Sequence, residues 1–201
     1  MPPAHRTRRA GGAKRIAVLD AVGPVLAERG YENTRFADVS AATGVAISTL
    51  QNYFGSREDM MIEAMRRYTD QEIVALDAAV TTGQDPWGRL VALIDRSLGN
   101  SGSTRQVLIE FWRAGMRDEE LREYSLEVQH RYREPFVRAV ADGRDQGFFT
   151  LVHSPDEIVD FLLVSLVGFM IPQVLQHPTP TAEGFRRVLL SQIRLAVGLQ
   201  P

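Results

Sequence analysis

The stretch that decides the fold is Phe36–Phe54, FADVSAATGVAISTLQNYF. Two short helices, over about residues 36–42 and 47–54, would bury one apolar set between them. Gly44 lies between the two helices, where the turn needs a residue that tolerates a positive φ, and the small Ser40 lets the helices cross closely. The apolar set consists of Val39, Val45, Leu50 and Phe54. This pattern predicts a helix-turn-helix.

The outer face of the second short helix is polar, short-chained and aromatic, unlike the acidic, Lys-rich face of an ordinary solvated helix. A recognition helix lies in the major groove of DNA and presents its N-terminal residues to base edges. Gln and Asn pair bidentately with adenine, and small methyl groups contact thymine. The face comprises Ala46, Ile47, Ser48, Thr49, Gln51, Asn52 and Tyr53. It favours DNA binding over a plain three-helix bundle, which is the alternative.

Composition and charge fit this interpretation. Of 201 residues, 44% are hydrophobic and 24% are charged, which is typical of a globular chain of one large or two small domains. The residues through Arg57 carry eight basic against four acidic side chains, and the rest carry 15 against 21. The basic residues of this front are Arg6, Arg8, Arg9, Lys14, Arg15, Arg29, Arg35 and Arg57. The asymmetry indicates either a polyanion partner or a solvated basic tail.

The parts of an enzyme are missing from the sequence. The chain has no cysteine, which excludes disulfides, thiolate nucleophiles and Cys-ligated metals and fits a reducing compartment. The four histidines are not at metal-ligand spacing, and no Gly-rich phosphate loop occurs. His130, near Glu127 and Glu134, is better explained as a surface residue of a helix than as an acid–base catalyst. We therefore expect no catalytic residues, no metal and no cofactor.

No segment predicts export or membrane insertion. Met1 to Arg15 is basic and polar and lacks the apolar stretch of a secretory signal. The most apolar run, Phe161–Ile171, is shorter than the roughly 20 residues that a membrane span needs. A buried helix in a soluble, cytoplasmic protein is the expectation.

Breakers and caps divide the chain into about nine helices. The first spans Lys14–Arg29, ends at Gly30 and should be kinked at Pro24, which cannot donate a hydrogen bond to Asp20. Thr34 is expected to cap the next helix. Later helices start at Ser56 with Asp59, at Asp85 with Pro86, and at Ser154 with Pro155 and Glu157, and a long one runs from about Asp118 to Gly147. Only Phe148–Val152 favours a strand, so the predicted class is all-α.

Residues 14–65 resemble the DNA-binding domain of the TetR family of transcriptional regulators. The resemblance is carried without gaps by one series of residues: Gly30-Tyr31, Thr34, Asp38-Val39, Thr43-Gly44-Val45, Thr49-Leu50, Tyr53-Phe54 and Ser56-Arg57-Glu58-Asp59. It implies a homodimer that places two recognition helices in successive major grooves of a palindromic operator.

The resemblance also implies which residues contact DNA. Phosphate contacts fall to Thr34, Tyr53 and Arg57, with Arg35 nearby, and base or backbone contacts fall to Ile47, Ser48, Thr49, Gln51 and Asn52. The sequence departs from the family pattern at Ala46, Ile47 and Gln51, which leaves the operator sequence open. The preceding arm, His5–Arg9, is either a minor-groove contact or a flexible terminus.

The expected domains are a basic flexible arm over 1–13, a helix-turn-helix domain over 14–57 and a helical effector-binding and dimerisation domain over 58–201. The last is similar, more loosely, to the BetI-type subgroup of the family. The resemblance implies a repressor released by a small-molecule effector. The alternative is a ligand-binding or scaffolding dimer without specific DNA readout, which the departures at Ala46 and Ile47 suggest.

The last two helices, over 155–176 and 181–199, are the expected dimerisation surface. The first of them is apolar nearly all round, and pairing two such hairpins into a four-helix bundle would bury it. The alternative is an internal core helix. The two stripes proposed for contact are Leu162, Leu166, Phe169, Met170 and Gln173 on one helix, and Phe185, Leu189, Gln192, Ile193 and Ala196 on the other.

The expected effector is medium-sized and largely apolar. Aromatic side chains with polar tips are typical linings of ligand pockets, although at helical spacing such residues also build cores. The candidate pocket residues are Trp87, Phe111, Trp112, Met116, Tyr124, Tyr132, Phe136, Phe161 and Phe169.

Overall fold

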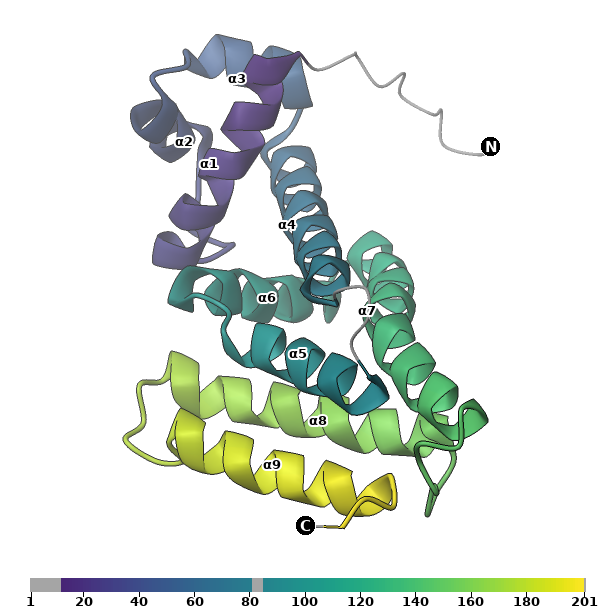
Figure 1. Ribbon diagram of the computed structural model, residues 1–201. Coiled ribbons are helices and arrows are strands. Elements are labelled where there is room, and N and C mark those ends of the chain that lie inside the picture. The colour runs from purple at the N-terminus through teal and green to yellow at the C-terminus, as the bar shows by residue number, and fades with distance from the viewer. Residues whose placement is uncertain (1–11, 81–84, 201) are drawn as a thin grey trace.

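In a computed structural model that describes residues 12–80 and 85–200, the chain is all-helical. Nine helices lie in these ranges and no strand does, as Figure 1 shows, which confirms the predicted fold class. They are α1 (Ala13–Arg29), α2 (Phe36–Thr43), α3 (Ile47–Phe54), α4 (Arg57–Ala79), α5 (Pro86–Leu98), α6 (Gly102–Gly115), α7 (Glu119–Asp145), α8 (Pro155–Val174) and α9 (Ala182–Ala196).

The helix starts follow the predicted caps. The side chains of Ser56, Asp85 and Ser154 accept hydrogen bonds from backbone N–H groups three residues on, and Glu157 completes a capping box with Ser154. The prediction for Thr34 is wrong, because the N-cap of α2 is Arg35 and the Thr34 side chain points into the protein.

The helix-turn-helix forms as predicted. Gly44 ends α2 in the left-handed conformation, with φ 69°. The buried set of Val39, Leu50 and Phe54 joins a core that also contains residues of α1, α4 and α6. The residues of α4 in this core include Met60 and Met65, which lie beyond residue 57. The core of the DNA-binding unit is therefore continuous across the expected boundary at 57/58.

The Gly-Pro pair inside α1 has a packing role. The helix continues across Pro24 to Arg29. A Cβ at Gly23 would overlap the ring of Tyr68 on α4. The absence of a side chain at Gly23 thus lets α1 and α4 approach closely. The same two helices are also joined by Asp20, whose carboxylate accepts two hydrogen bonds from Arg67, at 2.6 and 2.8 Å.

A second core holds the far half of the molecule together. It gathers buried residues of α5, α7, α8 and α9, with Leu76 from the end of α4. In Figure 1, α8 and α9 lie antiparallel at the end of the molecule opposite α2 and α3. The helices α4 and α7 contribute residues to both cores, so they join the DNA-reading end to the half of the molecule that holds the α8–α9 hairpin.

The segment predicted to favour a strand, 148–152, instead lies against the end of α9. The N–H of Thr150 donates to the carbonyl of Val197 at 3.0 Å, and that of Val152 donates to Ala196 at 3.1 Å. The β-like composition thus serves an extended segment that pairs with a helix end.

Gly198→Ala should destabilise the protein by about 2–3 kcal/mol. Gly198 has φ 74°, and a Cβ there would overlap the backbone carbonyl of Thr150, which cannot move without breaking the pairing above. Gly147→Ala is the matched control, because Gly147 has φ 70° but nothing within 4 Å of an added Cβ. It should cost only the left-handed conformation, about 1 kcal/mol. Urea denaturation of both variants measures the difference, and equal midpoints would contradict it.

By length and composition α8 would suffice to cross a membrane, with a mean hydropathy of 1.7, and only 22% of that window is buried. Its inner face, with Ile158, Leu162 and Leu166, belongs to the second core. Most of the apolar surface of α8 is therefore exposed in the single chain.

Candidate nucleic-acid interface and regulatory body

The helix α3 presents the predicted outer face to solvent. Ala46, Ser48, Gln51 and Asn52 are exposed, and Ile47 is 42% exposed. Thr49 and Tyr53 are half-buried, whereas Leu50 and Phe54 on the opposite side are buried. A short helix with polar amides on its open side and its apolar side fixed to a core has the form needed to enter a groove.

Two of the expected phosphate contacts point elsewhere. The side chain of Thr34 is fully buried, and its hydroxyl donates to the carbonyl of Gly30 at 2.9 Å. The guanidinium of Arg57 donates through Nε to the carbonyl of Thr34 at 2.5 Å and through Nη2 to the carbonyl of Tyr31. Both residues shape the turn between α1 and α2, and the sequence pattern does not distinguish this role from a phosphate contact.

Exposed cations flank the recognition helix. Arg35, at the start of α2, and Lys14, at the start of α1, are exposed. Arg15 is turned inward, where its guanidinium lies 4.8 Å from the ring centroid of Phe54 and pairs with Glu63. The predicted arm at His5–Arg9 lies outside the described residues. Arg35 and Lys14 are thus the described cations near this face that are free to meet phosphates.

Half of the residues expected at a dimer interface are buried within the chain itself. Leu162, Leu166, Leu189 and Ile193 are buried within one chain, and Phe169 stacks on Phe185 with ring centroids 4.2 Å apart. Met170, Gln173 and Ala196 are half-buried, and of the expected set only Gln192 is exposed. The expected stripe on α8 is therefore a core stripe. In a helix that is apolar on all sides, the sequence does not show which stripe faces the neighbouring helix.

The open face of α8 carries a different apolar stripe, the α8 seam. Its members follow each other at spacings of three and four residues, the pattern of a coiled-coil seam. They are Phe161, Val164, Gly168, Ile171 and Leu175, with Val188 and Leu195 exposed on α9. Val164 is 72% exposed, and an added Cβ at Gly168 would meet nothing within 4 Å. This stripe could not be singled out from the sequence, because nearly every position of α8 after Asp160 is apolar.

The candidate pocket residues do not line one cavity. Phe111, Trp112 and Tyr124 belong to the first core, whereas Trp87, Tyr132 and Phe136 belong to the second. Phe169 is buried against Phe185, and Met116 and Phe161 are 73% and 53% exposed. Aromatic residues at helical spacing proved to be core and surface residues here.

Polar contacts link α4, α5 and α7 within the body. The hydroxyl of Tyr124 on α7 lies 3.1 Å from that of Thr69 on α4, and the hydroxyl of Tyr132 lies 2.8 Å from that of Ser97 on α5. Burial raises the pKa of both tyrosines, so their hydroxyls stay neutral and can both donate and accept. Arg96 and Glu72 form an ion pair of 2.9 Å between α5 and α4.

A cavity of about 310 Å³ opens between the same three helices, α4, α5 and α7. It is lined by Asp77, Val80, Arg89, Pro135, Arg138 and Ala139. Arg89 pairs with Asp142 at 2.8 Å, while its buried Nε has no hydrogen-bond partner. None of the expected pocket residues lines this cavity. Within the described residues, no cluster of His, Asp and Glu has the arrangement of a metal site.

The chain matches two descriptions of known families. Residues 18–64 match the bacterial regulatory proteins of the tetR family, and residues 86–197 match the C-terminal domain of BetI-type transcriptional repressors. The first match covers the helix-turn-helix and the start of α4. The second extends from α5 to the end of α9.

Relatives of known name agree with these matches. The chain is 32% identical over 96 residues to the HTH-type transcriptional repressor KstR2 of Rhodococcus jostii, which is 48% of this chain and 47% of the relative. It is 27% identical over 113 residues to the regulator BetI of Stenotrophomonas maltophilia, 54% of this chain and 57% of that one. The matches thus span about half the length of these relatives.

A solved structure shares the whole architecture. The transcriptional regulator from Saccharomonospora viridis, solved in complex with choline, superposes with a TM-score of 0.82 at 23% identity, over 90% of this chain and 95% of that one. At that identity the likeness concerns the fold. Since the family matches cover both the helix-turn-helix and most of the body, the chain belongs to the TetR family of DNA-binding transcriptional regulators, with a BetI-type C-terminal domain.

Proposed function

We propose that this protein is a cytoplasmic, homodimeric repressor that binds a palindromic operator and is released by a small-molecule effector. The observation that carries the proposal is the combination of an exposed, amide-bearing α3 with an unpartnered apolar seam on α8 at the other end of the same chain. The outer face of α3 would contact DNA, and the exposed stripe of α8 would bring two copies of the chain together.

The seam supports a dimer through α8 and α9. Val164, Gly168 and Ile171 lie on the side of α8 that is turned away from its own core. A second copy of the same hairpin would cover them in a four-helix arrangement, and the open space at Gly168 allows the partner helix to approach. A two-fold dimer would then set two recognition helices about 34 Å apart, one turn of DNA.

The effector site in this proposal is the region between α4, α5 and α7. The cavity there offers volume, and the charged side chains of Asp77, Arg89 and Arg138 that line it offer polar contacts. The Saccharomonospora viridis regulator of similar fold was solved in complex with choline, which supports a small-molecule effector for this chain. An effector releases the protein only if it binds the DNA-free conformation more tightly than the bound one.

Alanine replacements on α3 test the DNA-reading part. Gln51→Ala and Asn52→Ala should each cost about 1–3 kcal/mol at one base pair of the operator and relax the preference there, because an amide that pairs with a base edge is lost. Both side chains are exposed and support no core contact, so the fold should be unaffected.

The measurement is the base preference at each position, obtained by selecting bound duplexes with each variant. Glu28→Ala is the control, an exposed residue at the end of α1 away from α3. Preferences identical to the wild-type pattern in both α3 variants would show that α3 does not read bases, and would favour the scaffolding alternative.

A further inference from the structure

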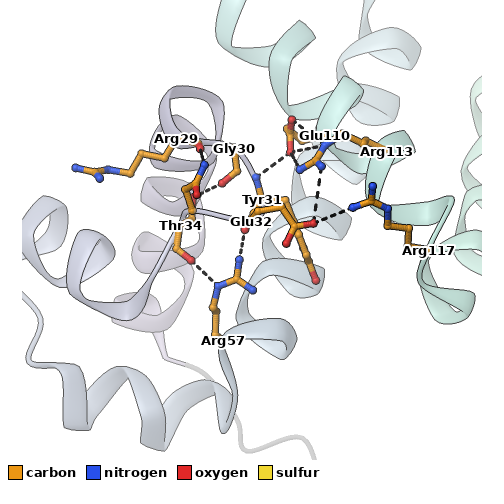
Figure 2. Close-up of polar contacts among 10 residues, drawn as sticks. Arg29, Gly30, Tyr31, Glu32, Thr34, Arg57, Glu110, Arg113 and Arg117 are labelled. Carbon is orange, nitrogen blue, oxygen red and sulfur yellow. Dashed lines mark hydrogen bonds and ion pairs between the residues drawn. The ribbon is translucent and has the colours of Figure 1, made fainter.

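The turn between α1 and α2, residues 30–35, is held from two sides by parts of the protein outside the helix-turn-helix. Figure 2 shows Glu110 and Arg113 of α6, with Arg117 just after that helix, on one side and Arg57 of α4 on the other. The turn leads directly into α2, and α2 leads through Gly44 into α3. Its position therefore fixes where the recognition helix begins.

The contact from α6 is centred on one carboxylate. Glu110 accepts a hydrogen bond of 2.8 Å from the backbone N–H of Tyr31. The same carboxylate pairs with Arg113 at 2.8 Å, and its side chain is only 18% exposed. Gly30, with φ 77°, brings the backbone against this carboxylate, since a Cβ there would lie 3.8 Å from its oxygens. A hydrogen bond to a charged, largely buried acceptor is among the stronger ones in proteins.

Two further ion pairs lie beside this contact. Arg117 and Arg113 lie 3.3 and 3.8 Å from the carboxylate of Glu32, which is the next residue along the turn. On the other side, Arg57 donates to the carbonyls of Tyr31 and Thr34. The N–H of Tyr31 is thus bound by α6 and its carbonyl by α4, so this one peptide segment joins both helices to the DNA-reading unit.

The start of α6 is bonded to the body as well. Arg105 donates to the carbonyl of Asn100, and the side-chain oxygen of Asn100 accepts from Arg96 of α5, which pairs with Glu72 of α4 at 2.9 Å. The start of α6 is therefore linked through Asn100 to α5 and α4, whereas Glu110, later in the helix, contacts the turn before α2.

We infer that Glu110 is a positioning residue for DNA binding: its carboxylate holds the α1–α2 turn, which leads through α2 into the recognition helix. This inference rests on the proposed function, because the position of α3 matters only if α3 reads DNA.

The test compares Glu110→Ala and Glu110→Gln with the wild-type protein. Glu110→Ala removes both the acceptor for Tyr31 and the partner of Arg113, and should weaken binding to the selected operator roughly five- to thirtyfold. Glu110→Gln keeps an oxygen acceptor but loses the charge, and should give a smaller loss of about threefold. Glu120→Gln is the matched control, because it removes a 2.8 Å ion pair with Arg66 that does not touch the turn.

Hydrogen exchange supplies a readout that does not depend on DNA. In Glu110→Ala the N–H of Tyr31 should exchange at least tenfold faster than in the wild type, and the faster exchange should extend through residues 30–54 while α8 and α9 are unchanged. In Glu120→Gln these residues should exchange as in the wild type.

The outcomes separate the two hypotheses. If the wild-type protein enriches no operator, the proposed function fails, while the exchange of residues 30–54 still decides whether Glu110 holds the turn. If the protein binds its operator and Glu110→Ala matches the wild type in affinity, Glu110 does not position the recognition helix α3. Lower thermal stability with unchanged affinity and unchanged exchange in 30–54 would show a merely structural residue and would also overturn the inference.

Discussion

Replacing Val164 and Ile171 together by aspartate should convert the proposed dimer into a folded monomer and lower operator affinity at least about a hundredfold. Both side chains lie on the open face of α8, 72% and 47% exposed, so charges there cost the protomer little. In a dimer the same charges would be buried without partners, which is strongly unfavourable. Affinity collapses because two linked half-sites bind far more tightly than one.

Light scattering and an operator titration measure the two effects together. Val74→Asp is the control, because Val74 on α4 is 64% exposed but does not belong to the seam. It should leave the dimer and the affinity intact. A double variant that stays dimeric with wild-type affinity would place the interface elsewhere on the molecule.

The second large effect is expected at Phe111 of α6. Its side chain is 1% exposed and packs in the core shared with α1, α3 and α4. Phe111→Ala should lower the free energy of unfolding by about 3–5 kcal/mol, because it leaves a cavity where the DNA-reading unit meets the body. The loss should appear in the helix-turn-helix as well as in α6, since one core serves both.

Denaturant unfolding followed by circular dichroism measures this loss. Leu126→Ala is the control, a residue of α7 that is 65% exposed and should change stability by less than about 0.5 kcal/mol. A Phe111→Ala variant as stable as the wild type would contradict the packing of Phe111 in this shared core. It would instead favour the sequence-based expectation that Phe111 lines a ligand pocket.

Local features of the fold were predictable from the sequence. The helix-turn-helix was predictable because α3 is amphipathic: Leu50 and Phe54 fall on one side and Gln51 and Asn52 on the other, and Gly44 marks the turn. The caps at Ser56, Asp85 and Ser154 were predictable because each is a local interaction between residues close in sequence.

The body was harder, because its choices depend on contacts between helices far apart in the chain. On α8 nearly every position is apolar, so pattern alone did not decide whether Leu162 or Val164 faces the core. Likewise Thr34 and Arg57 have residue types that suit phosphate contacts, but their partners are backbone carbonyls brought near by folding. Glu110 gave no sequence signal, because its partner Tyr31 is distant in sequence.

In the proposed function, two copies of α3 read one two-fold-symmetric DNA sequence. Selection of bound duplexes from a random pool by the wild-type protein at moderate salt measures whether they do. We expect an enriched palindrome whose half-sites are centred about 10 base pairs apart. No enrichment, with binding that simply fades as salt rises, would mean non-specific contact with phosphates alone and would contradict the claim.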